Sequence, residues 1–337
     1  MSANGFAVIG AFLDLLRFGA AGLAVALGVN TLSSASRGRR SQSENRAYLS
    51  AILAYLLLGL ALASWTSLYL LLDSFVAESP GAMCIYGVTR VGEGSPGVFG
   101  WLPTLVAGVQ IMKPVLVFVA GAAVVLYGLY RRAGTQAMLP RFVAALLLLG
   151  LLSLADVAAE TAYLLIPKRD VPLDTGCCSV AAAEVDSSRV PTPDEERWLP
   201  PAFFASQLLM ACLMGLPGPW KVSAPSIMRL AGSLTASAVA ACVAVKFVID
   251  QAAPALLHLP YHHCLYDLVG QIHESGVAIG LLLWGTFCVG WSFVAGCFGR
   301  TPDTLAYLAA EIRRLQLWAA FGYLGSAVMF GVDLWLA

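Results

Sequence analysis

Four cysteines and a histidine pair are the residues of this chain best suited to bind a metal or to exchange disulfides. The chain has eight cysteines and only four histidines. Two of the histidines stand next to a cysteine in the stretch PYHHCLYDL, Pro260 to Leu268. Thiolates, thioethers and imidazoles are the ligands that favour Cu(I) and, less specifically, Zn(II) or Hg(II). The candidate metal or redox residues are therefore Met83, Cys84, Cys177, Cys178, His262, His263 and Cys264.

Three interpretations of these cysteines remain open. The adjacent Cys177 and Cys178 cannot easily bond to each other, but each can form a structural disulfide with a different loop. Soft-metal binding is the second interpretation, and thiol–disulfide exchange is the third. The chain has no C-x-x-C pair, which counts against exchange, and no ligand spacing that is diagnostic of a metal. The working prediction is binding or transfer of a soft, copper-like metal; the alternatives are a quinone-linked thiol–disulfide redox protein and a non-catalytic membrane subunit with structural disulfides.

Ionisable residues inside apolar segments form a second group. Charge in lipid is unfavourable, so such residues pair with one another or mark a functional pathway. Asp14 lies three residues before Arg17, and Lys246 lies four residues before Asp250, so each pair is placed on one helical face. Lys113 and Asp156 lie at similar depths in consecutive spans, which predicts a contact between them. Two interpretations of these residues are open: they form inert ion pairs, or they line an outward-facing cavity for a proton, an ion or a small polar solute. The candidate intramembrane polar residues are Lys113, Asp156, Glu160, Lys246, Asp250, His273 and Glu274.

Composition predicts the class of protein that must position these residues. Hydrophobic residues make up 59% of the chain and charged residues 12%, and the mean hydropathy is +0.77. These values indicate an all-α integral membrane protein whose main partner is the lipid bilayer. The formal net charge is zero, so nothing favours a nucleic-acid partner. Haem is not expected, because the chain has no C-x-x-C-H sequence and its histidines cluster at one edge.

Windows of about 20 residues, the length that crosses the hydrocarbon core, predict one transmembrane domain over 1–337. The fifth of its spans is short and bracketed by prolines, so it could be tilted or re-entrant. Residues 301–314 are amphipathic and predict a short inner helix or an extension of the last span. The eight expected spans are 6–32, 48–76, 102–130, 141–166, 201–217, 230–256, 268–298 and 315–336.

The distribution of Lys and Arg predicts the orientation in the membrane. With both termini outside, the inner segments hold twelve of these residues and the outer segments five. The outer loops are then 77–101, 167–200 and 259–267, and they contain all four candidate cysteines. We expect these loops to converge on the extracytoplasmic side of a bacterial inner membrane, where other membrane or extracytoplasmic subunits could also bind.

Overall fold

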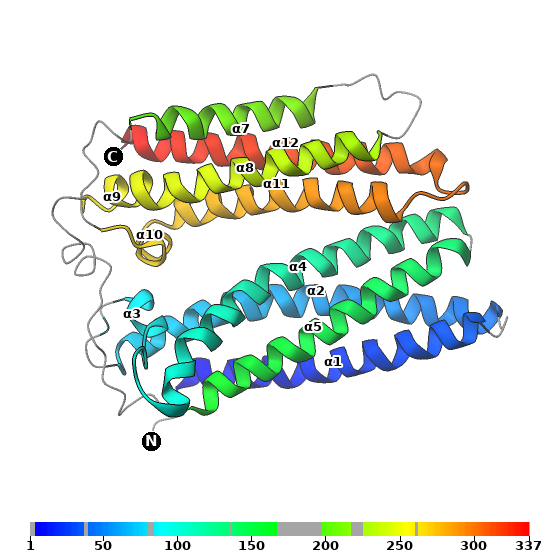
Figure 1. Ribbon diagram of the computed structural model, residues 1–337, viewed down its shortest axis with the longest axis horizontal. Coiled ribbons are helices and arrows are strands. Elements are labelled where there is room, and N and C mark those ends of the chain that lie inside the picture. The colour runs from blue at the N-terminus through cyan, green and yellow to red at the C-terminus, as the bar shows by residue number, and fades with distance from the viewer. Residues whose placement is uncertain are drawn as a thin grey trace. The chain divides into compact units, whose positions relative to one another are not determined.

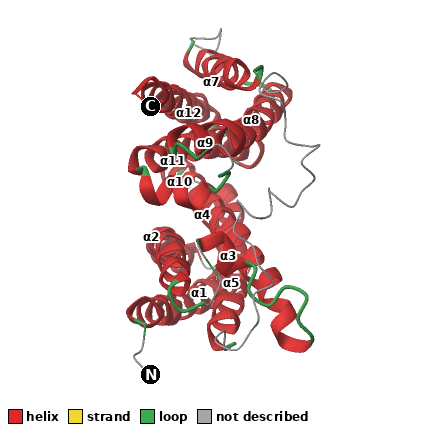
Figure 2. Cartoon of the chain, turned by 90° about the vertical axis from the view of Figure 1, so that its left-hand side faces the viewer, coloured by secondary structure: helices red, strands yellow, loops and turns green. Residues whose placement is uncertain are grey.

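The structure, a computed structural model, is helical, as the sequence predicts. Helices contain 88% of the described residues, and none of these residues lies in a strand. Figure 2 draws the described chain as red helices joined by green loops. The structure describes residues 4–36, 40–79, 82, 84–134, 136–166, 197–216, 225–259 and 262–336.

The chain divides into two compact units. Unit 1 consists of Met1–Thr175 together with Thr301–Thr304, and unit 2 of Gly176–Arg300 together with Leu305–Ala337. Each unit has its own helices and its own core, and each is described by itself below.

Unit 1 contains four long helices. The first, α1, packs against both α2 and α5, and α4 packs against the same two helices, so the four close around a shared interior. Figure 1 shows them running side by side, with the short helix α3 at the end where α2 finishes. Their bounds, with those of the short connecting elements, are α1 Gly5–Ser36, α2 Arg40–Val76, α3 Ile85–Thr89, η1 Gly97–Trp101, α4 Leu102–Ala133, η2 Gln136–Met138 and α5 Leu139–Leu165.

Local sequence accounts for the way α4 begins and ends. Pro103 occupies the first turn, where its missing N–H removes no helical hydrogen bond. Arg131 and Arg132 lie in the last turn, where positive charge is favourable beside the helix dipole. Gly134 then ends the helix with a φ of 64°, and its N–H donates to Tyr130 O at 3.0 Å. A left-handed residue of this kind is a common helix stop, and glycine adopts it without strain.

Unit 2 is also built from four main helices. The last helix, α12, packs against α7 and α11, and α8 packs against the same two helices. Figure 1 draws α7 and α8 in green to yellow and α11 and α12 in orange to red. The bounds in this unit are α7 Leu199–Gly215, α8 Ile227–Phe247, the π-helical η3 Val248–Ala252, α9 Ala253–Leu256, α10 Leu265–Gln271, α11 His273–Phe298 and α12 Leu305–Leu336.

Small residues bring α11 and α12 close together. A Cβ atom added at Gly322 would lie 2.6 Å from Leu281 O and 2.7 Å from Gly285 N, so α12 touches the backbone of α11 there. Close approach at small residues is a common way for helices to associate in lipid. An aromatic cluster fills the space between α7, α8 and α12, where the rings of Phe203 and Phe247 stack with centroids 4.0 Å apart.

In the part of the chain that the structure describes, seven helical segments are long and apolar enough to cross a membrane. Many of their large apolar side chains point outward. Leu15 of α1, for example, is 68% exposed and Val239 of α8 is 60% exposed. Such surfaces suit contact with lipid. Together with the length of these apolar helices, they indicate an integral membrane protein. The seven segments are Gly5–Ser34, Asn45–Val76, Gly97–Ala133, Leu139–Leu165, Ile227–Leu256, His273–Phe298 and Leu305–Leu336, while α7 is a shorter apolar helix of 17 residues.

One boundary differs from those expected, and at another the structure decides between two expectations. The predicted span 268–298 is divided, because α10 ends at Gln271 and the extended backbone of Ile272 separates it from α11. Residues 305–314 are the first turns of α12, which is the extension of the last span that was one of the two expectations for this segment. Leu308 and Ile312, one turn apart on that stretch, are both buried, so the core face of α12 continues through it.

Candidate functional site

A network of buried charged side chains lies inside unit 1. Lys113 of α4 is central to it: the Nζ atom donates to Ser64 Oγ at 2.7 Å and to Asp156 Oδ2 at 2.8 Å. The same ammonium group pairs with Glu160. Ser64 belongs to α2, and Asp156 and Glu160 belong to α5. Three helices therefore meet at one ammonium group, and the predicted contact between Lys113 and Asp156 is confirmed.

Arg17 brings α1 into the same network. Its Nη1 atom lies 3.0 Å from Glu160 Oε2 and 2.7 Å from Ser64 Oγ, and its Nη2 atom pairs with Asp156. The guanidinium also holds Asp14, one turn earlier in α1, at 3.1 Å. A guanidinium has five N–H donors in one plane, so a single Arg side chain can bridge several carboxylates. Arg17 thus links α1 to both α2 and α5.

Water has almost no access to these charges. Asp14 is 4% exposed, Lys113 is 0% exposed, and the other three charged residues of the network are 1% exposed each. Removing a charge from water is strongly unfavourable unless opposite charge and hydrogen bonds replace the solvent. The network supplies both, since two cations and one hydroxyl lie among three carboxyl groups.

The network does not satisfy every polar atom. Three carboxyl groups face two cations, so the fully ionised network carries one uncompensated negative charge. The Asp156 Oδ2 atom accepts from Arg17 and Lys113, but Asp156 Oδ1 is buried and has no hydrogen-bond partner among the described residues. Buried polar atoms are almost always paired, so this oxygen calls for an explanation.

The sequence indicated part of this network. The spacing of Asp14 and Arg17 predicts their ion pair, and the spacing of Asp156 and Glu160 places both on one face of α5. The contacts of Arg17 with α5 were missed, because Asp14 already offered a local partner. Ser64 was missed as well, since a single serine in a long apolar run is unremarkable in composition.

The second predicted ion pair lies in unit 2. Lys246 Nζ is 2.5 Å from Asp250 Oδ2, which confirms the pairing expected from their spacing. The two side chains are 46% and 26% exposed, so this pair is much more open than the network of unit 1. Asp250 lies in η3, a π-helical turn that interrupts the regular hydrogen bonding of α8 and α9. Glu160, which was expected to line the same outward-facing cavity as Lys246 and Asp250, belongs to the network of unit 1.

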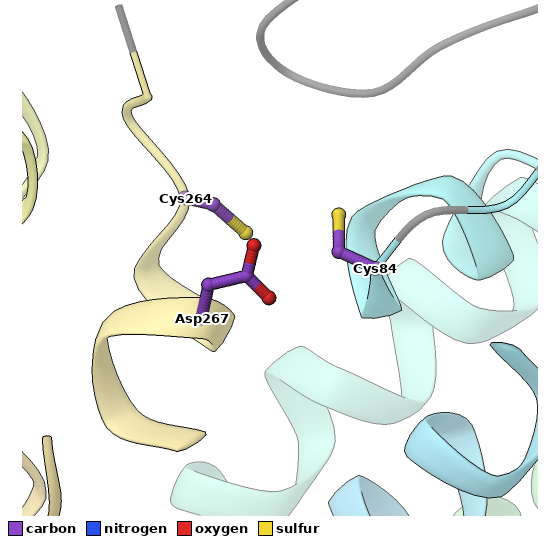
Figure 3. Close-up of side chains that lie close together, drawn as sticks. All are labelled: Cys84, Cys264 and Asp267. Carbon is purple, nitrogen blue, oxygen red and sulfur yellow. The ribbon is translucent and has the colours of Figure 1, made fainter. Parts of the chain in front are cut away.

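Cys264 and Asp267 lie side by side at the start of α10. Cys264 immediately precedes the helix, is 2% exposed, and has its Sγ atom within 4.8 Å of an Asp267 carboxylate oxygen. Figure 3 shows these two side chains pointing toward one another. The His262 Nε2 atom lies 2.6 Å from Asp267 Oδ2. A thiol, a carboxylate and an imidazole are therefore gathered within six residues of chain.

The two adjacent histidines have different partners. His263 Nδ1 lies 3.1 Å from the backbone oxygen of Ile249, in η3, while His262 contacts Asp267. Only His262 therefore joins Cys264 and Asp267, and His263 fastens the turn to the π-helical segment. Sequence reasoning did not include Asp267 among the site residues, although its position in the first turn of α10 was visible in PYHHCLYDL.

The remaining candidate thiols have different settings. Cys84, also labelled in Figure 3, belongs to unit 1, where it immediately precedes α3 and is 3% exposed. Met83, Cys177 and Cys178 lie outside the described residues, as does most of loop 167–200. Cys288 is buried in α11, as expected for a packing residue. Among the other helical cysteines, Cys212 and Cys242 are exposed and Cys297 is partly exposed.

His273 and Glu274 form the first turn of α11. A carboxylate in a first turn is favoured by the helix dipole, which accounts for Glu274 there without a functional role. That His273 and Glu274 line an intramembrane polar cavity stays a prediction.

Comparisons with protein-family models, with curated proteins and with solved structures find no match to this chain.

Proposed function

We propose that this integral membrane protein binds or transfers a soft, copper-like metal ion, with Cys264 and Asp267 among the ligands. The observation that supports this proposal is the proximity of the buried Cys264 sulfur to the partly exposed Asp267 carboxylate, at most 4.8 Å apart. A thiolate is the ligand that selects Cu(I), and a thiolate with a nearby carboxylate or imidazole also suits Zn(II).

His262 and the start of α10 support the same role. A ligand that is hydrogen-bonded by a second residue keeps its orientation, and such outer partners often change metal affinity by about 10- to 100-fold. His262 contacts Asp267 in this way, at 2.6 Å. Cys264 immediately precedes α10 and Asp267 lies in its first turn, so the start of this helix fixes the two side chains relative to one another.

The proposed topology has eight membrane-crossing helices with both termini outside. Helix α7, with 17 residues, would be about 26 Å long, close to the thickness of the hydrocarbon core. The twelve inner and five outer Lys and Arg residues favour this orientation. Loops 77–101, 167–200 and 259–267 would then be extracytoplasmic in a bacterial inner membrane, and the charged network of unit 1 would lie at membrane depth.

Metal content and affinity of the full-length purified protein test the proposed function. Titration with Cu(I) or Zn(II), each supplied alone from a chelator buffer, is expected to show a bound ion that Cys264→Ser removes. Asp267→Asn is expected to weaken affinity by about 10- to 100-fold. Cys212→Ser is the matched control, since it removes an exposed thiol of unit 2 and should leave binding unchanged.

The same variants separate the alternatives. Equal metal content in wild type and Cys264→Ser would contradict metal binding at this position. If thiol counting then showed cysteines that change between oxidised and reduced forms with quinone, the thiol–disulfide redox function would replace it. If the thiols were permanently oxidised under all conditions, the cysteines would be structural disulfides of a non-catalytic subunit.

A further inference from the structure

We infer that the charged network of unit 1 is a proton-binding site, in which Asp156 carries one exchangeable proton. This inference is independent of the proposed metal function, because every residue in it belongs to unit 1. It depends on two observations, the count of buried charges and the unpaired oxygen of Asp156.

The charge count requires one further positive charge. Asp14, Asp156 and Glu160 supply three carboxyl groups, and Arg17 and Lys113 supply two cations. All five residues are at most 4% exposed, so solvent cannot screen the excess negative charge. Buried carboxyl groups in such surroundings usually become neutral by taking up a proton. One bound proton makes the network electrically neutral.

Asp156 differs from the other two carboxyl groups in having a buried oxygen without a partner among the described residues. Asp14 Oδ1 accepts from Arg17 at 3.1 Å, and Asp14 Oδ2 faces the Thr161 hydroxyl at 3.4 Å. Glu160 Oε2 accepts from Arg17, from Lys113 and, at 3.4 Å, from Ser64. Asp156 also uses one oxygen for both cations, but its Oδ1 is buried without a partner in the described part of the chain.

A proton on Asp156 Oδ1 removes the excess negative charge without breaking any contact. The Oδ2 atom remains an acceptor for Arg17 and Lys113, while the bare oxygen no longer carries negative charge in an apolar setting. Lys113 Nζ touches both Asp156 and Glu160, so the carboxyl groups one turn apart on α5 compete for the same cation. The proton is taken up from water and returned to water, and no other reactant is needed.

Infrared spectroscopy of the full-length protein in lipid tests the inference. Exposed carboxyl groups are ionised at neutral pH, so a C=O band of a protonated carboxylic acid reports a buried one. We expect such a band in the wild type at pH 7, and a shift of that band when aspartate is labelled with ¹³C at its side-chain carboxyl. Asp156→Asn should abolish the band. Asp333→Asn is a necessary control and should leave it, because Asp333 Oδ2 is another buried carboxylate oxygen without a partner among the described residues.

Conservative variants locate the proton even if Asp156→Asn does not fold. In labelled Asp156→Glu protein the acid band should lose its isotope shift, whereas in labelled Asp14→Glu protein the shift should remain. Absence of an acid band in the wild type would overturn the inference, as would a band that aspartate labelling does not move. If the acid band is absent and the thermal stability of the protein rises with Na⁺ or K⁺ at constant ionic strength, the network holds a metal cation in place of the proton.

Discussion

Lys113 Nζ lies 2.8 Å from Asp156 Oδ2, and both side chains are completely buried. This ion pair joins α4 to α5, and through Arg17 and Ser64 the same charges reach α1 and α2. Since all four long helices of unit 1 contribute, the network holds the unit together as well as forming its polar centre.

Loss of the Lys113 charge should destabilise the protein strongly. Lys113→Met is expected to reduce the free energy of unfolding by about 3 kcal/mol, because it leaves buried carboxylates with one cation fewer. Lys246→Met is the matched control, and because the pair of Lys246 with Asp250 is partly exposed, a change below about 1 kcal/mol is expected. Thermal and denaturant unfolding in detergent measure the loss of stability in both variants. Equal losses would contradict the prediction that the buried pair contributes more than the partly exposed one.

Arg313 should hold the last turn of α7 in place. Its guanidinium donates to Met214 O at 2.8 Å, Gly215 O at 2.6 Å and Leu216 O at 3.2 Å, which are carbonyls that a helix end leaves unpaired. Arg313→Ala should therefore increase hydrogen–deuterium exchange in the last turn of α7. Arg314→Ala removes an exposed neighbour whose partner is Glu311, and exchange in α7 should stay unchanged. Similar exchange in both variants would show that Arg313 does not stabilise this end.

Gly322 should tolerate no side chain. Gly322→Ala is expected to reduce the free energy of unfolding by about 1 to 3 kcal/mol, because its Cβ would overlap the backbone of Leu281 and Gly285 in α11. Gly280→Ala is the control on α11, where an added Cβ meets nothing within 4 Å. That variant should be neutral or stabilising by up to about 1 kcal/mol, since alanine favours a helix. A stable Gly322→Ala protein would contradict the close approach of α11 and α12.

The phenol of Tyr323 should contribute through its buried hydrogen bond. Its oxygen lies 2.6 Å from Ser237 Oγ, and both residues are 0% exposed. Tyr323→Phe is expected to lower the free energy of unfolding by about 1 to 3 kcal/mol, because it leaves the serine hydroxyl without this partner. Adding Ser237→Ala removes that buried hydroxyl, so the double variant should lose less than the sum of the single losses. Strict additivity in chemical denaturation would show that the two groups do not interact.

Much of the helical architecture could be predicted because it depends on local sequence. Apolar runs of sufficient length predicted α1, α2, α4, α5, α8, α11 and α12 near their observed positions. Helical spacing also predicted two ion pairs within single helices, Asp14 with Arg17 and Lys246 with Asp250. The division before α11 was not predictable from hydropathy, since Ile272, the residue at the break, is itself apolar.

The sequence by itself determined the membrane character of the protein, because the length and hydropathy of a helix are properties of consecutive residues. It also determined which charged residues belong to apolar helical segments. Only the tertiary structure decided that Arg17 shares Asp156 and Glu160 with Lys113, and that Ser64 lies between them. These contacts depend on how each helix is rotated about its axis against its neighbours, and that rotation is set by packing between residues far apart in the chain.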